Sequence, residues 1–133
     1  MSEILWCADN GDGTYRNPVL YCDYSDPDAI CVNGTYYLTA STFNYVPGLP
    51  ILTSRDLVNW KLRNYAVKNI PEARYAAPQH AQGIWAPAIR FQNGRFYIYY
   101  GMPDEGIYMV STENPLGDWD TPVSYTHLRA HET

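Results

Sequence analysis

Two short apolar and aromatic runs meet at Asn33-Gly34, and this junction constrains the fold more than any other stretch. The run Ala-Ile-Cys-Val (29–32) precedes the pair, and the run Thr-Tyr-Tyr-Leu-Thr (35–39) follows it. Val, Ile, Thr and Tyr favour β-strands. Asn-Gly supplies the two positive φ angles that a type I′ turn requires. The sequence therefore predicts an antiparallel β-hairpin at this place.

The same pattern returns 60 residues later, at Asn93-Gly94. In both copies a strand-like run precedes the turn, a Tyr-rich run follows it, and a third strand-like run begins with Ile. Trp60 and Trp119 close the two units. A repeated unit of four strands is typical of a propeller blade, whereas a chance likeness of two hairpins is the alternative. We therefore predict an all-β fold with about two blades.

Two blades are fewer than a propeller needs, because propellers close with about four to eight. Open sheet edges and an incomplete core would remain. We therefore expect the sequence to be a piece of a longer protein, with residues 1–122 forming the first part of a propeller domain. Residues 123–133 lack strand-like alternation and resemble translated sequencing-adaptor read-through. We predict that they are a non-native tail and exclude their histidines as ligands.

Composition excludes several classes of partner. The formal net charge is −5, without runs of Lys or Arg, so we expect no nucleic-acid partner and no membrane partner. The first residues show no secretory signal, which predicts a cytoplasmic location and leaves secretion open. Cys7, Cys22 and Cys31 are expected to be buried thiols rather than a disulfide or metal set. No cofactor is predicted, and the sequence indicates no oligomeric state.

Two further segments carry expectations. The cluster Asp-Asn-Gly-Asp-Gly (9–13) has some features of a calcium loop, but it lacks the third-position ligand and the glutamate at position twelve. We interpret it as a tight loop without a metal ion. Residues 63–83 show weak periodicity, so we expect one long irregular segment there.

Three motifs in order resemble glycoside hydrolase family 43. Residues 24–41 resemble its first blade, residues 49–60 its next signature, and residues 83–97 its second blade. The likeness covers about residues 15–122. It implies a five-bladed propeller that carries an inverting exo-glycosidase, usually a β-xylosidase or an α-L-arabinofuranosidase. Residues 1–122 would then be the N-terminal part of a glycoside hydrolase catalytic domain.

The resemblance also assigns a site residue. Asp26, held by the rigid Pro27, matches the family's general base, whereas a lone Asp before Pro would be interpreted as a turn cap. Trp85 and Phe43 are candidate apolar walls of a sugar subsite, with packing inside a blade as the alternative. The resemblance implies a Glu general acid and a further Asp in later blades. This chain alone is therefore expected to be inactive.

The predicted function is hydrolysis of glycosidic bonds in sugars derived from xylan or arabinan. The expected substrate is an oligosaccharide or a small glycoside. One rival is a carbohydrate-binding propeller without catalysis, which would need the same aromatic residues. A purely structural or protein-binding propeller would leave Asp26 unexplained.

Overall fold

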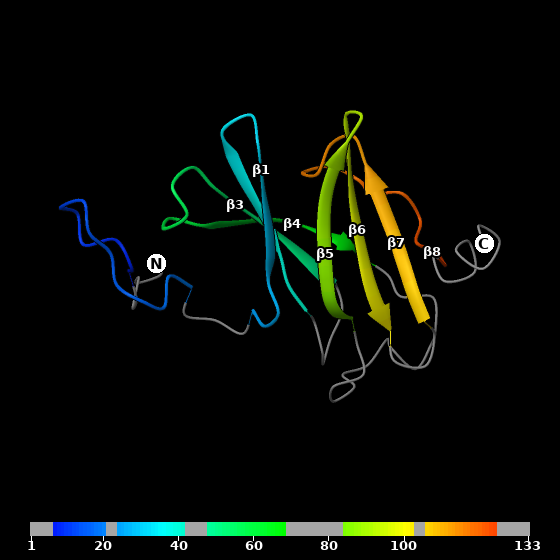
Figure 1. Cartoon of the computed structure of the whole chain (residues 1–133), viewed down its shortest axis with the longest axis horizontal. Coiled ribbons are helices and arrows are strands. Elements are labelled where there is room, and N and C mark those ends of the chain that lie inside the picture. Colours follow the sequence, from blue (N-terminus) through cyan, green and yellow to red (C-terminus); the bar gives the residue numbers. More distant parts are fainter. Residues whose placement is uncertain (1–6, 21–23, 42–47, 69–83, 103–105, 125–133) are drawn as a thin grey trace.

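The chain folds into two four-stranded antiparallel sheets (Figure 1). The computed structural model describes residues 7–20, 24–41, 48–68, 84–102 and 106–124. The first sheet contains β1 (Asp28–Val32), β2 (Thr35–Thr39), β3 (Gly48–Ser54) and β4 (Lys61–Val67) in sequence order. The second contains β5 (Trp85–Gln92), β6 (Arg95–Met102), β7 (Gly106–Thr112) and β8 (Val123–Ser124), again in sequence order. This arrangement confirms the all-β prediction of two blades.

Both predicted hairpin turns are confirmed. Asn33 and Gly34 have φ angles of 52° and 81°, and Asn93 and Gly94 have φ angles of 53° and 79°. These are the two consecutive positive values of a type I′ turn, whose twist matches that of the strands it joins. Each turn therefore fixes the register of its hairpin. In the first hairpin Val32 pairs with the residue just after the turn, and the pairing continues without a shift to the start of β1.

The core lies between the two sheets. Along the whole of β6, every second side chain is buried in this core and the others are half-buried. Ile98 is fully buried, and Phe96 meets the ring of Tyr37 from β2 edge-on at 4.9 Å between ring centroids. Burial raises the pKa of the Tyr100 phenol on the same face, with a smaller contribution from Tyr108. The facing surfaces of two blades thus form one apolar layer.

Inner strands β1 and β5 lie next to each other at the middle of the molecule (Figure 1). At the outer side of each sheet, the closing tryptophan donates its indole N–H to a backbone carbonyl of the preceding turn. Trp60 reaches the Leu57 oxygen at 2.9 Å, and Trp119 reaches the Pro115 oxygen at 3.1 Å. The repeat therefore extends from the inner hairpin to the outer turn.

The prediction of one irregular segment over 63–83 is wrong at its start. Residues 63–67 belong to β4, and residues 69–83 lie outside the described residues. Strand β4 is the outer edge of its sheet, and its first three residues are exposed. Because these three successive residues are all exposed, both faces of the strand meet solvent there, and its sequence shows no regular alternation of apolar and polar residues.

The prediction of buried thiols is wrong for the two cysteines that the structure describes. Cys7 and Cys31 are both exposed, and neither is in a disulfide. Cys31 lies between Ile30 and Val32, whose side chains pack on the core. Because side chains alternate across a strand, Cys31 must point to the opposite face of the first sheet. Cys22 lies outside the described residues.

Candidate active site

Asp26 stands at the entrance to β1, one residue before Pro27. Its backbone has a φ of 49°. Positive φ is uncommon for a residue other than glycine, although Asp tolerates it better than most. Residues in such conformations persist where the surroundings hold them, and they cluster at functional sites. The surroundings of Asp26 are therefore informative.

Ser41 lies across the hairpin from Ser25 and Asp26. The register from Val32↔Thr35 to Asp28↔Thr39, extended without a shift, would pair Ser41 with Asp26. The Ser41 amide instead donates to the Ser25 carbonyl at 2.9 Å, so the register shifts by one residue beyond the named strands. The Ser41 hydroxyl donates to Oδ2 of Asp26 at 3.3 Å.

The second sheet reaches the same serine. The backbone N–H of Ala86 donates to the Ser41 hydroxyl oxygen at 2.7 Å. This donor is available because the pairing of β5 with β6 shifts between Trp85 and Ala88, and Ala86 within this irregularity has a φ of 40°. Such bulges take a residue out of the ladder and redirect its groups, often beside active sites. The bulge therefore joins the second sheet to the Asp26 carboxylate through one hydroxyl.

Asp28 forms a second link between the sheets. Its Oδ2 accepts the backbone N–H of Ile89 at 2.9 Å and a guanidinium N–H of Arg90 at 2.9 Å. The Arg90 side chain is 61 % exposed, so the ion pair itself contributes little to stability. The bond from the Ile89 amide satisfies a donor on the inner strand of the second sheet. Asp28 thus fixes β1 against β5 beside the candidate base.

The structure brings only part of the predicted site into view. Asp26 lies at the junction of the two sheets, as just described. Trp85 is the first residue of β5 and directly precedes Ala86, so its backbone lies at the same junction. Phe43 lies outside the described residues. The roles of Asp26, Trp85 and Phe43 remain predictions.

Sequence reasoning missed Ser41 and the link made by Asp28. A signal for Ser41 was present, because a two-residue turn pairs residues that are equally distant from it. Applied to Asn33-Gly34, this rule brings Ser41 and Asp26 together, although the backbone pairing shifts by one residue there. The Asp28 link had no comparable signal, since it depends on how the second sheet packs against the first.

The loop over 9–13 satisfies its own carboxylates. Asp9 accepts the Asn59 side-chain amide at 3.0 Å and the Gly11 amide at 2.8 Å, and these bonds lower the pKa of Asp9. Hydrogen bonds from the Thr14 hydroxyl and amide likewise lower the pKa of Asp12. In the described part of the chain, no three His, Cys, Asp or Glu side chains are arranged to hold a metal ion. The carboxylates therefore act in the loop as turn acceptors.

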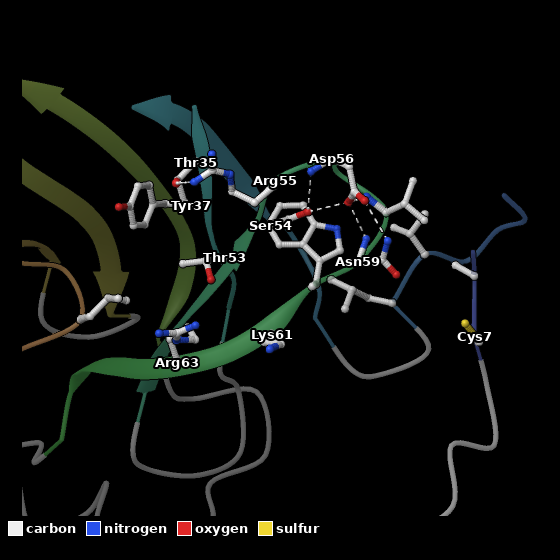
Figure 2. Close-up of a pocket in the computed structure, with 16 residues that line it drawn as sticks. Cys7, Thr35, Tyr37, Thr53, Ser54, Arg55, Asp56, Asn59, Lys61 and Arg63 are labelled. Carbon is white, nitrogen blue, oxygen red and sulfur yellow. Dashed lines mark hydrogen bonds between the residues drawn. The ribbon is translucent and has the colours of Figure 1, made fainter. Parts of the chain in front are cut away.

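A groove of about 900 Å³ lies on the first sheet, and Asp26 is not among the residues that line it. Figure 2 shows the lining residues. The groove is lined on one side by the turn after β3 and on another by Lys61 and Arg63 of β4. Thr35, at the turn end of the first hairpin, also lines it. Asp26 stands at the opposite end of that hairpin, so the groove and the candidate base are separate places on the first sheet.

The sequence matches Glycosyl hydrolases family 43 over residues 15–131. This range covers most of the chain. The chain belongs to this family.

Family 43 relatives share the sequence closely. A putative β-xylosidase of Xylanibacter ruminicola is 44 % identical over 113 residues, which cover 84 % of this chain and 21 % of the relative. The non-reducing end α-L-arabinofuranosidase BoGH43B of Bacteroides ovatus is 38 % identical over 127 residues, which cover 90 % of this chain and 24 % of the relative. The chain therefore spans about a fifth to a quarter of the length of these curated relatives.

Solved family 43 structures share the fold as well. The crystal structure of the BlXynB protein from Bacillus licheniformis matches with a TM-score of 0.73 and 32 % identity, over 82 % of this chain and 24 % of that one. The family and fold predictions are confirmed, with two blades of the five-bladed propeller present here. The family match runs past residue 122, and Val123 and Ser124 pair with β7. The proposed boundary at 122/123 remains a prediction.

Among the residues that the structure describes, no helix has the length and apolarity needed to cross a membrane.

Proposed function

We propose that the longer protein containing this chain is an inverting glycosidase acting on sugars derived from xylan or arabinan, with Asp26 as its general base. The observation that carries the proposal is the placement of Asp26. Its carboxylate stands at the entrance to an inner strand, at the junction of two blades, and is held there by a buried hydroxyl. The names of the two relatives, a β-xylosidase and an α-L-arabinofuranosidase, support the substrate class.

The reaction requires two carboxyl groups on opposite sides of the glycosidic bond. Asp26 takes a proton from a water molecule as the water oxygen bonds to the anomeric carbon. The bond from that carbon to the leaving oxygen breaks, and a carboxylic acid protonates the leaving oxygen. An inverting site holds the two groups about 6.5–9.5 Å apart, which leaves room for the water. The acid and the third carboxylate are expected from later blades.

The environment of Asp26 suits a base. Oδ2 accepts the Ser41 hydroxyl, and within the described residues no donor reaches Oδ1. One carboxylate oxygen is thus held while the other is left to accept a proton from water. A catalytic hydrogen bond in a structure without substrate is often long, as the 3.3 Å separation is here.

The test is hydrolysis of aryl β-xyloside and aryl α-L-arabinofuranoside by the full-length protein and its Asp26→Asn variant. The amide keeps the shape of the carboxylate but cannot accept the proton. We expect kcat to fall by about 10²–10⁴-fold while KM changes little, because the base acts on water in the transition state. NMR of the first-formed sugar anomer should show inversion by the wild type. Azide, which needs no base, should restore part of the turnover.

Near-normal turnover by Asp26→Asn would make Asp26 a turn residue and overturn the assignment. The alternative function is that of a sugar-binding propeller without catalytic activity. It predicts that the wild type binds xylo- or arabino-oligosaccharides without cleaving them. The enzyme names of the relatives do not favour it.

A further inference from the structure

We propose that Ser41 is a positioning residue that sets the Asp26 carboxylate against the second blade. The inference rests on the proposed function of Asp26 as the base. It adds a residue that acts through the carboxylate. It also explains why the Ser41 hydroxyl is ordered: the bulge of β5 supplies the Ala86 N–H that bonds it.

Two hydrogen bonds fix the direction in which the Ser41 hydroxyl donates its proton. A serine hydroxyl has one proton to donate and lone pairs with which to accept. Ala86 donates to the Ser41 oxygen at 2.7 Å, which occupies a lone pair and leaves the proton for Oδ2 of Asp26 at 3.3 Å. The order of donors therefore runs from the Ala86 amide through the serine to the carboxylate.

Burial keeps this arrangement in place. Ser41 is 3 % exposed, so bulk water does not compete freely for its hydroxyl. Its own amide is held by the Ser25 carbonyl at 2.9 Å, which fixes the backbone from which the side chain projects. Asp26, by contrast, is exposed and has no second side-chain partner among the described residues. The buried serine is thus the fixed member of the pair, and the exposed carboxylate is the member that it orients.

The two residues bonded to the Ser41 hydroxyl, Asp26 and Ala86, both have constrained backbones. Asp26 and Ala86 both directly precede a proline and both have positive φ, at 49° and 40°. Proline restricts the residue before it, so each side of the Ser41 hydroxyl is bonded to a locally constrained position. A shift of either kink would lengthen one of the two hydrogen bonds. Ser41 therefore transmits the relative position of the two blades to the carboxylate.

The chain offers a matched control on the same strand face. Thr39 precedes Ser41 by two residues, is fully buried, and its hydroxyl has no partner within the described part of the chain. Replacing an unpaired buried hydroxyl by an apolar group of the same shape is neutral or stabilising. Thr39→Val thus removes a hydroxyl from the same face without removing a described hydrogen bond.

The experiment is a double-mutant cycle in the full-length protein, using aryl β-xyloside and aryl α-L-arabinofuranoside as substrates. The variants are Ser41→Ala, Asp26→Asn, the combination of both, and Thr39→Val. We expect Ser41→Ala to lower kcat about tenfold with KM within about twofold, as for loss of a hydrogen bond to a charged group. Thr39→Val should keep kcat within about twofold of the wild type.

The cycle separates positioning from a general structural role. If Ser41 acts through the carboxylate, adding Ser41→Ala to the Asp26→Asn variant causes no further fall in kcat. The same tenfold fall in both backgrounds, or a wild-type kcat for Ser41→Ala, would overturn the proposal. If Ser41→Ala does not fold, Ser41→Cys keeps the volume with a much weaker donor, and we expect a similar loss in kcat.

Failure of this inference is distinguishable from failure of the proposed function. Normal turnover by Asp26→Asn overturns the assignment of the base, whatever Ser41→Ala does. A large loss in Asp26→Asn together with normal turnover in Ser41→Ala leaves the base assignment in place and removes only the role of Ser41.

Discussion

The first and second blades enter their inner strands through the same backbone kink but with different side chains. Asp26-Pro27 and Ala86-Pro87 are 60 residues apart in the repeat. The residue before each proline has positive φ, at 49° and 40°. In the second blade an alanine, which has no polar side chain, adopts this conformation, and its backbone N–H is bonded to the Ser41 hydroxyl. The kink therefore recurs in both blades, whereas the carboxylate is present only in the first.

The difference continues across each hairpin. The position that holds Ser41 in the first blade holds Gly101 in the second. At the junction, the first blade contributes a carboxylate and a hydroxyl, and the second contributes a backbone N–H from its bulge. The first repeat thus carries the polar side chains, while the second contributes the backbone geometry that contacts them.

The largest expected effect comes from giving the first blade the residue of the second. Asp26→Ala copies Ala86 at a position where the second blade already tolerates alanine with positive φ. We therefore expect the full-length variant to fold and bind substrate while kcat falls by about 10²–10⁴-fold. Turnover of aryl glycosides, together with a thermal melt, measures both. A variant that unfolds would show that the Asp side chain, unlike the alanine of blade two, is needed for the kink.

A second prediction concerns the apolar layer. Ile98 on β6 is fully buried between the blades, and Leu38 on β2 occupies the same place in the repeat. Leu38 lies outside the cluster that joins the two sheets. We expect Ile98→Ala to lower the free energy of unfolding by about 3 kcal/mol.

Leu38→Ala should cost the full-length protein a similar amount, because closure of a five-bladed propeller covers the other face of the first sheet. Urea unfolding of the two variants against the wild type measures this. A loss below about 1 kcal/mol for Leu38→Ala alone would mean that no blade packs tightly on that face.

The comparison also shows what the sequence could predict. The two hairpins were predictable because Asn-Gly carries its own turn geometry and sets the register. The candidate base was predictable because its motif resembles a known family. The hydrogen bond from the Ile89 amide to Asp28 was not predictable, since it depends on packing between blades. The exposure of Cys31 follows from the strand period, which a general rule about cysteine burial ignores.

The outer turns provide the last contrast. In the first blade, Oδ1 of Asp56 accepts the amides of Val58 and Asn59 at 2.9 and 2.8 Å. In the second, Oδ1 of Asn114 accepts the Leu116 amide at 3.1 Å. Both turns thus place a side-chain oxygen on the amide two residues ahead, but only the first uses a group that titrates. The backbone and side-chain hydrogen bonds from Asn59 hold the pKa of Asp56 well below its ordinary range.

The smallest expected effect is therefore a pH dependence of the outer turn in the first blade, which the outer turn of the second blade lacks. A carboxyl whose pKa is lower in the folded than in the unfolded state stabilises the fold above its unfolded pKa, about 3.9 for Asp. That contribution is lost as the pH falls through the folded pKa. Asp56→Asn copies the amide of blade two, so its melting temperature should lie slightly below the wild type at pH 7. The deficit should shrink as the pH falls below about 4, because only the wild type then loses its carboxylate.

Thermal melts of the full-length protein from pH 7 to pH 3 measure the difference, with Asn114→Ala as a control whose deficit should not follow this titration. A deficit for Asp56→Asn that stays constant across this range would mean that the negative charge adds nothing to the turn beyond what an amide provides.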